Sequence, residues 1–223
     1  MIGFAQMLAE GHIGTLNPKQ LEYASLINHS TNAVLAIIDD ILDLASIDTG
    51  DMTLELSEVD LPDVILRASE GLKDRILEQK LALMIETPPQ LGLFMADQHR
   101  LRQIIFNLLS NAIGFSNPGQ VITIGAAREA DMISLHVTDH GRGIDPDIIH
   151  QVFDRFDSHT KGSRHRGAGL GLSLVRSFVE LHGGTVSIWS KPGEGTRVTC
   201  RFPVNGPQQT QPALTQNRNV THA

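Results

Sequence analysis

The stretch Asp139-His-Gly-Arg-Gly143-Ile144 decides the fold, because it places a carboxylate and two glycines directly after an alternating segment at 132–139. Related clusters flank it in a fixed order: Asn107-Leu-Leu-Ser-Asn111, Phe153-Asp-Arg-Phe156, Gly167-Ala-Gly169-Leu-Gly171-Leu172 and Gly193-Glu-Gly195-Thr196. A lone glycine string often marks only a turn. Several asparagine and glycine clusters, each beside a predicted helix or strand end, indicate one site assembled from separate segments.

This ordered set resembles the N, G1, F and G2 boxes of the ATP-binding domain of bacterial sensor histidine kinases. That domain belongs to a wider fold family shared with DNA gyrase and the heat-shock chaperone ATPases. The resemblance covers about residues 1–204. It implies a two-layer α/β sandwich, in which a mixed sheet carries helices on one face, preceded by a helical hairpin that forms a dimeric four-helix bundle.

The periodicity of the sequence predicts the same α+β architecture. Most neighbouring strands are joined by turns too short for a crossover helix, which favours an antiparallel-rich mixed sheet with helices packed on one face. We expect helices at 61–79, 97–112 and 170–182, and strands at 51–59, 81–85, 91–95, 121–127, 132–139, 185–190 and 196–202. The polar, glycine-bearing segment 157–168 is typical of a mobile loop.

Residues 1–50 read as two helices, the first ending near residue 10 and the second running from Asn17-Pro18 to about residue 47. Apolar positions of the second helix recur at alternating steps of four and three, which is the spacing of a bundle seam. They are Tyr23, Ile27, Ser30, Val34, Ile37, Ile41 and Leu44, and the stripe is widened by Leu35, Ile38 and Leu42. So wide a stripe needs more cover than a short first helix supplies, so we expect a homodimer through residues 1–50.

Composition bounds the class of protein. The 223 residues suffice for one ordinary domain plus a smaller element, and the composition of 205–223 indicates a disordered tail. The resemblance implies that the domain is an ATP-binding catalytic domain at 51–204 and that the smaller element is a partial dimerisation and phosphotransfer hairpin at 1–50. The formal charge of −7 argues against a nucleic-acid partner, and no apolar run is long enough for a membrane segment. The single Cys200 fits a reducing compartment, so we expect a cytoplasmic protein or the cytoplasmic part of a longer sensor.

Asn107 and Asn111 are four residues apart on one predicted helix, so their amides face the same way. Amide oxygens can ligate a hard cation such as Mg²⁺, whereas the plainer alternative is a pair of amides that hydrogen-bond a nearby loop. The resemblance implies that Asn111 is the Mg²⁺ ligand. It also places Asn107 where the chaperone-type ATPases carry a water-activating glutamate, and an amide cannot act as that base.

Asp139 ends a predicted strand, and the glycines that follow let a flat base approach the backbone. An Asp-initiated turn is the plainer alternative. The resemblance makes Asp139 the adenine selector, assisted by Thr196, and makes the loop glycines 167–171 a lid over ATP. The full ATP-binding set that it implies is Asn107, Asn111, Asp139, Gly141, Gly143, Ile144, Phe156, Arg164, Arg166, Gly167, Gly169, Leu170, Gly171 and Thr196.

Two departures from the family pattern stand out. The phosphoacceptor histidine that precedes an Ile-Gly-Phe such as Ile2-Gly3-Phe4 is not in this sequence, and neither His12 nor His29 is expected to replace it. The basic residue that commonly follows Asn-Ala-Ile in the family is Gly114 here, so we expect weaker phosphate binding unless Arg164 or Arg166 compensates.

The resemblance implies a histidine kinase of a two-component system, with ATP and Mg²⁺ as cofactors. It would transfer the γ-phosphate to a histidine and then to an aspartate on the receiver domain of a response regulator. No catalytic residue is assigned within this chain, which alone is not expected to autophosphorylate. One alternative is a catalytically silent, ATP-binding dimeric module that signals by conformation. A gyrase-type or chaperone-type ATPase is disfavoured by Asn107.

Overall fold

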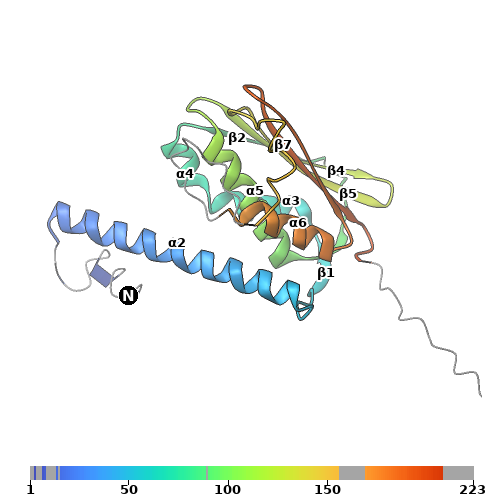
Figure 1. The fold of residues 1–223 in the computed structure, drawn as a ribbon, viewed down its shortest axis with the longest axis horizontal. Coiled ribbons are helices and arrows are strands. Elements are labelled where there is room, and N and C mark those ends of the chain that lie inside the picture. The colour runs from blue at the N-terminus through green and yellow to red at the C-terminus, as the bar shows by residue number, and fades with distance from the viewer. Residues whose placement is uncertain are drawn as a thin grey trace, which may run out of the picture.

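The computed structural model describes residues 3, 7, 8, 14, 16–88, 90–155 and 169–207. Residues 61–203 contribute a helical layer and a sheet, and Figure 1 shows the helices gathered on one side of the strands. The helices are α2 (Pro18–Asp48), α3 (Leu61–Glu70), α4 (Lys73–Glu78), α5 (Gln98–Phe115) and α6 (Gly171–Leu181). The two-layer α/β sandwich is therefore confirmed. Most of the expected first helix, the loop at 157–168 and the tail beyond residue 207 lie outside the described residues.

The main sheet has five strands in the order β2-β4-β5-β7-β6. Its strands are β2 (Ala82–Glu86), β4 (Val121–Glu129), β5 (Met132–Asp139), β6 (Thr185–Lys191) and β7 (Gly195–Pro203). Only the pair β2–β4 is parallel, and α5 lies between these two strands in the chain. The pairs β4–β5, β5–β7 and β6–β7 are antiparallel, so the sheet is mixed and antiparallel-rich, as predicted.

A separate two-stranded sheet pairs β1 (Leu56–Val59) with β3 (Phe94–Asp97). The predicted strand at 51–59 is shorter than expected, because its pairing ends where Leu56 faces Asp97. One residue earlier, the backbone N–H of Glu55 donates to Asp97 Oδ2 instead of to a strand carbonyl. The predicted helix at 61–79 is two helices, because the chain leaves the helix at Gly71 and turns Leu72 into the core, where it is 1% exposed.

Helix α5 is the centre of the core. Asp97 caps its N-terminus, because Asp97 Oδ1 accepts from the backbone N–H of Arg100 at 3.1 Å. One face of the helix carries seven buried apolar side chains: Leu101, Ile104, Ile105, Leu108, Leu109, Ala112 and Ile113. They pack against the helix-facing side of β4, β5 and β7, to which Cys200 belongs. Burial raises the pKa of the Cys200 thiol to about 12, as expected of a core residue.

Helix α2 begins with a capping box, in which the Asn17 side chain accepts from Gln20 N–H and the Gln20 side chain accepts from Asn17 N–H. Its C-terminal half lies along the helical layer, and its N-terminal half extends beyond the sandwich (Figure 1). Leu44, the last residue of the predicted seam, is buried within the chain at 4% exposed. Ile37 and Ile47 are half-buried, and the remaining large apolar side chains of α2 are exposed by 44–62%: Leu21, Tyr23, Leu26, Ile27, Val34, Leu35, Ile38, Ile41 and Leu42.

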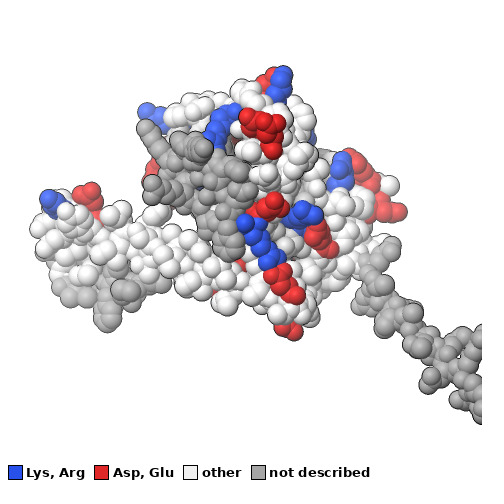
Figure 2. Space-filling view, viewed as in Figure 1, with Lys and Arg blue, Asp and Glu red and all other residues white. Residues whose placement is uncertain are grey.

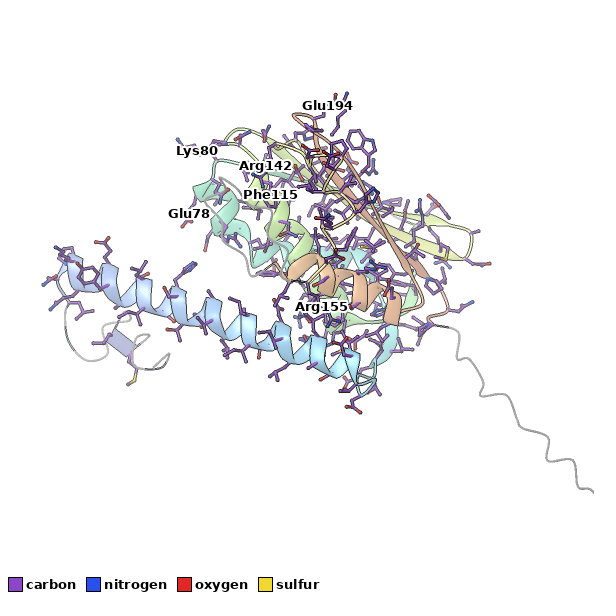
Figure 3. All side chains as sticks on the ribbon, viewed as in Figure 1. Glu78, Lys80, Phe115, Arg142, Arg155 and Glu194 are labelled. Atoms are coloured by element: carbon purple, nitrogen blue, oxygen red, sulfur yellow. The ribbon has the colours of Figure 1, made fainter. Side chains whose placement is uncertain are left out.

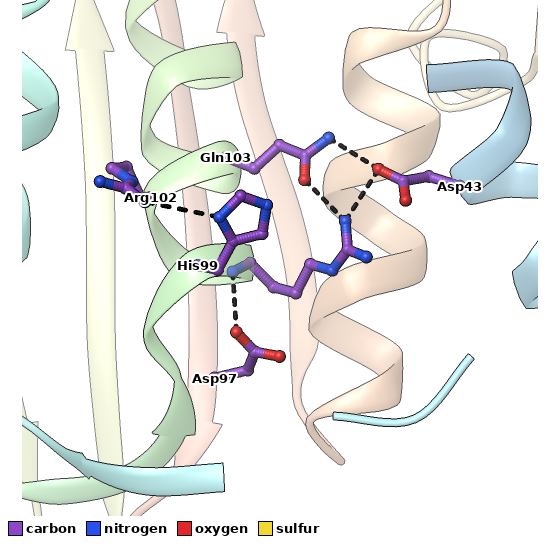
Figure 4. Close-up of polar contacts among 6 residues, drawn as sticks. Asp43, Asp97, His99, Arg102 and Gln103 are labelled. Carbon is purple, nitrogen blue, oxygen red and sulfur yellow. Dashed lines mark hydrogen bonds and ion pairs between the residues drawn. The ribbon is translucent and has the colours of Figure 1, made fainter. Parts of the chain in front are cut away.

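Polar contacts fix the C-terminal half of α2 to the sandwich. Asp43 accepts from Arg100 Nη1 at 2.8 Å and from Gln103 Nε2 at 3.0 Å, so two residues of α5 meet one carboxylate of α2 (Figure 4). At the end of α2, Asp48 forms a bidentate ion pair with Arg155, which Figure 3 labels between α2 and α6. None of the described helices combines the length and the apolar character needed to cross a membrane.

Candidate nucleotide-binding site

Asp139, Thr196 and Ser190 form one row across three strands. Asp139 of β5 pairs with Thr196 of β7, and Thr196 pairs with Ser190 of β6. Directly paired residues project to the same side of a sheet, so the three side chains lie next to one another. Because Asp139 is only 7% exposed on a strand whose buried residues contact the helices, the row faces the helical layer.

The Asp139 carboxylate is held by backbone donors. Its Oδ1 accepts from Gly141 N–H at 2.9 Å, and the backbone N–H of Thr196 also donates to it. Burial raises the pKa of Asp139 above its ordinary value, and these two hydrogen bonds oppose the rise. The carboxylate is therefore a hydrogen-bond acceptor with a fixed orientation, which suits a ligand with an amine.

Two glycines allow the backbone to close around Asp139. A Cβ at Gly141 would lie 2.1 Å from the carbonyl oxygen of Phe115, and a Cβ at Gly195 would lie 2.0 Å from that of Asp139. Neither distance is possible for a side chain without a backbone shift. Gly195 also has a φ of +107°, which other residues rarely adopt. Gly141 is therefore required for the close approach of the Phe115 backbone, and the approach of a flat base to this glycine stays a prediction.

The loop after β5 is tied to the turn between β6 and β7. Gly193 N–H donates to the carbonyl oxygen of Arg142 at 2.8 Å, and Ile144 N–H donates to Ser190 Oγ at 2.9 Å. Gly143 has a φ of +69°, and a Cβ there would lie 2.0 Å from the carbonyl oxygen of Lys191. The predicted residues Gly143 and Ile144 thus shape the wall of the site through their backbones.

The second half of the site lies where α5 meets the N-terminus of α6. The position of a Cβ at Gly171 is 3.6 Å from Asn107 Oδ1 and 3.8 Å from Asn111 Nδ2, so both amides lie against the first turn of α6. Among the described residues, Asn107 Nδ2 is a buried polar atom without a hydrogen-bond partner. A buried donor left unpaired costs about 1–3 kcal/mol, and such groups are concentrated at functional sites.

The start of α6 is fixed by Leu170, which is buried at 1% exposed. Its carbonyl oxygen accepts from Leu174 N–H and from Ser173 Oγ, both in the first turn of the helix. Gly169, just before it, has a φ of +71°. The unpaired N–H groups of such a helix start are suited to phosphate oxygens. Four predicted site residues lie outside the described residues: Phe156, Arg164, Arg166 and Gly167.

Phe115 joins the two halves, and the sequence interpretation did not include it. It follows Asn107 and Asn111 at steps of four on α5, and its backbone touches Gly141 beside Asp139. The guanidinium of Arg142 lies 4.8 Å from the centre of its ring, and Figure 3 shows the two at the end of the domain that also carries Glu194. An aromatic residue one turn beyond the asparagine pair was the available signal.

Within the part of the chain that the structure describes, no three His, Cys, Asp or Glu side chains group to hold a metal ion. The side-chain amides of Asn107 and Asn111 lie next to α6, with Asn107 Oδ1 and Asn111 Nδ2 nearest to Gly171. Amide oxygens are hard ligands, and Mg²⁺ usually takes one or two protein oxygens and completes its shell with water and phosphate. These residues therefore fit a magnesium ion that arrives with a phosphate ligand.

Comparison with known proteins agrees with this geometry. Residues 96–206, which contain all described site residues, match the family described as histidine kinase-, DNA gyrase B- and HSP90-like ATPase. The fold and site thus define a domain of that ATPase class. Residues 1–50 match the His Kinase A (phospho-acceptor) domain. The chain belongs to the sensor histidine kinase family.

Several curated relatives carry the same core. The chain is 35% identical over 218 residues to the sensor protein DivL of Caulobacter vibrioides, covering 96% of this chain and 27% of DivL. It is 33% identical over 205 residues to the histidine protein kinase DivJ of the same organism, covering 92% of this chain and 34% of DivJ. It is 35% identical over 207 residues to the circadian input-output histidine kinase CikA of Synechococcus elongatus, covering 91% of this chain and 28% of CikA. The chain spans about a quarter to a third of these relatives.

Solved structures show the same arrangement. Full-length ShkA in complex with AMPPNP superposes with a TM-score of 0.77 at 25% identity, over 92% of this chain and 42% of ShkA. The histidine kinase AdeS of Acinetobacter baumannii gives a TM-score of 0.70 at 18% identity, over 92% and 93% of the two chains, and shows the shared fold.

Proposed function

We propose that this chain is the kinase core of a two-component sensor that binds Mg-ATP and transfers its γ-phosphoryl group to a histidine. A receiver-domain aspartate of a response regulator would then take the phosphoryl group. The observation that carries the proposal is the placement of α5. At the C-terminal end of α5, the backbone of Phe115 lies against Gly141, next to Asp139. On the same face of α5, the amides of Asn107 and Asn111 lie against the first turn of α6.

The Asp139 end suits the adenine base. A carboxylate that accepts hydrogen bonds can receive the exocyclic amine of adenine, and the backbone of Phe115 closes this end of the site against Gly141. ShkA, which shares this fold, was solved with the adenine nucleotide AMPPNP. We infer from this likeness that the adenine of ATP lies against the Asp139–Thr196 pair.

The Asn111 end suits the phosphates. Asn111 would offer an amide oxygen to Mg²⁺, and Asn107, whose amide nitrogen has no partner among the described residues, would donate toward the same region. Gly169, Leu170 and Gly171 bring the start of α6 to this place. Bound Mg²⁺ would neutralise charge on the phosphates, while the residues of this chain orient them for transfer.

The exposed stripe of α2 supports a homodimer through residues 1–50. Between Tyr23 and Ile38 the helix carries no Lys, Arg, Asp or Glu, and Figure 2 shows this part of α2 as an uncharged surface between charged ends. A second copy of the helix would bury the stripe in a four-helix bundle. In this proposal the dimer works in the cytoplasm, where ATP and the response regulator are available.

Titration calorimetry with ATP, with and without Mg²⁺, tests the proposal. We expect ATP binding that weakens without Mg²⁺, and Asp139→Ala should weaken it at least tenfold, since a charged hydrogen bond is worth about 1.5–3 kcal/mol. Asp145→Ala, which removes an exposed carboxylate from the following turn, is the matched control and should bind as the parent does. Equal affinity for ATP in the Asp139→Ala variant and the parent would refute the adenine assignment.

A further inference from the structure

Ser190 makes three hydrogen bonds from a single hydroxyl group. Its Oγ accepts from Ile144 N–H at 2.9 Å, lies 2.9 Å from the carbonyl oxygen of Gly195, and lies 2.8 Å from Thr196 Oγ1. It is half-buried, on the side of β6 that faces the helices. Sequence reasoning gave it no role, because a serine in an alternating edge strand has no distinguishing pattern.

The directions of these bonds follow from counting protons. A carbonyl oxygen can only accept, so the single Ser190 proton is donated to Gly195. In the contact with Thr196, Ser190 therefore acts as the acceptor, and Thr196 donates its own hydroxyl proton. Thr196 Oγ1 then has lone pairs to offer and no proton, while Ser190 uses its remaining lone pair for Ile144.

We propose that Ser190 is a specificity-positioning residue, which sets the Thr196 hydroxyl as a pure acceptor and so makes the base site select adenine over 6-oxopurines. This inference rests on the proposed nucleotide site. Asp139 and Thr196 are paired neighbours, and with the Thr196 proton engaged both present acceptors to the base. Adenine meets them with an amine donor, whereas hypoxanthine and guanine place an acceptor oxygen at the same atom.

Removal of the Ser190 hydroxyl has two separable effects. Ile144 N–H loses its acceptor, which loosens the wall of the site and weakens all nucleotides alike. Thr196 loses the acceptor for its proton and becomes free to rotate and donate. A Thr196 hydroxyl that is free to donate binds a 6-oxopurine better than the Thr196 hydroxyl of the parent does. The ratio of the ATP and ITP affinities therefore changes, as well as the affinities themselves.

The test compares ATP with ITP, which differs only in the oxygen at C6 and the proton at N1, by calorimetry at fixed Mg²⁺. The parent should prefer ATP, and Ser190→Ala should reduce the ATP-to-ITP affinity ratio about three- to tenfold, the range of one neutral hydrogen bond. Ser187→Ala, an exposed serine on the opposite side of the same strand, should keep the parent ratio. An unchanged ratio in Ser190→Ala, even with both affinities reduced, overturns the inference.

A double-mutant cycle with Thr196→Val shows whether Ser190 acts through Thr196. In the Thr196→Val background no hydroxyl remains to be oriented, so Ser190→Ala should leave the ATP-to-ITP ratio unchanged. A further change of the ratio in that background would also overturn the inference. A parent protein that binds neither nucleotide refutes the proposed function itself, whereas a parent that binds ATP while Ser190→Ala keeps its selectivity refutes only the role of Ser190.

Discussion

Arg100 of α5 and Asp43 of α2 form an ion pair with an Nη1–Oδ2 distance of 2.8 Å, and their side chains are 19% and 18% exposed. The same guanidinium lies 5.0 Å from the centre of the Phe178 ring on α6. Arg100 of α5 therefore contacts both α2 and α6, and it links α2 to the helix that carries both site asparagines.

Arg100→Ala should lower the free energy of unfolding by about 2 kcal/mol, because it leaves the half-buried Asp43 with Gln103 as its remaining partner and removes the contact with Phe178. Urea unfolding followed by circular dichroism measures the change. Arg102→Ala, which removes an exposed arginine from the same helix, should stay within about 0.5 kcal/mol of the parent. Equal losses in the two variants would contradict the role given to Arg100.

Asp40 should make the fold less stable as the pH rises. Burial, followed by the charge of Asp43, raises the pKa of Asp40 from 3.8 to about 6, although a hydrogen bond from Gln103 opposes this. The folded state therefore binds a proton more tightly than the unfolded state, and the stabilisation present below pH 3.8 is lost as the pH rises toward about 6. Arg100 faces the same place from α5 through its ion pair with Asp43.

Asp40→Asn removes the charge, so it should gain about 1–2 kcal/mol over the parent at pH 7.5, a figure reduced for solvent screening at a half-buried site. The gain should shrink toward pH 4. Unfolding curves at several pH values measure it, and Asp51→Asn, in the exposed turn after α2, should stay within about 0.5 kcal/mol of the parent. A gain that is constant between pH 4 and 7.5 would show that the charge of Asp40 is not responsible.

Gly141→Ala should destabilise the protein by about 2–4 kcal/mol, since its new Cβ would lie 2.1 Å from the backbone carbonyl oxygen of Phe115. Thermal unfolding measures this loss. The matched control is Gly71→Ala, whose Cβ would lie 3.6 Å from the nearest backbone oxygen at a helix end with a φ of −65°. That variant should be neutral or slightly more stable. Similar unfolding temperatures for both variants would contradict the close approach of Phe115 and Gly141.

Gly114→Lys should tighten ATP binding several-fold. A recovered charged hydrogen bond is worth about 1.5–3 kcal/mol at most, and side-chain entropy and solvent screening reduce the gain. Gly114→Ala is the control, because replacing glycine in a helix alone contributes up to about 1 kcal/mol of stability. Calorimetry with ATP and AMP separates the two, since the lysine should favour the nucleotide with more phosphates. Identical affinities in Gly114→Lys and Gly114→Ala would contradict a missing phosphate contact at this position and would fit compensation by Arg164 or Arg166.

Ile41→Glu should dissociate the proposed dimer, because it introduces a charge into the apolar stripe of α2 at a side chain that is 44% exposed in the single chain. Light scattering should report two chains for the parent and one for the variant at the same concentration. Asn32→Glu, on an exposed polar position of the same helix, should remain dimeric. A parent that stays monomeric at high concentration would remove the basis for the dimer.

The fold was predictable from the sequence where apolar residues recur along a segment with one constant spacing. Strand β5 was predicted at its observed bounds, Met132–Asp139, and α2 within one residue of its end at Asp48. The break between α3 and α4 was missed, because the apolar spacing of a helix does not show that buried Leu72 leaves the helical conformation. The spacing of apolar residues in a helix does not show where tertiary packing breaks that helix.

The candidate site was predictable where a residue type is distinctive, and its nucleotide roles stay predictions. The structure does bring Asp139 next to Thr196, and Asn107 next to Asn111 and Gly171. Ser190 and Phe115 were missed because their importance depends on strand register and on a contact between distant segments. Serine in a strand and phenylalanine at a helix end are ordinary in isolation, so only the pairing across β5, β7 and β6 distinguishes Ser190.

The row Asp139–Thr196–Ser190 takes one residue from each of three antiparallel strands, and this has a consequence for folding. A slip of β7 by one residue would turn Thr196 to the opposite side of the sheet and bring Gly195 or Arg197 into its place. The row exists only in the correct alignment, so a ligand that binds it stabilises correctly aligned molecules alone and draws the population toward them. Ligand binding would thus favour the correct register of β5, β7 and β6 during folding.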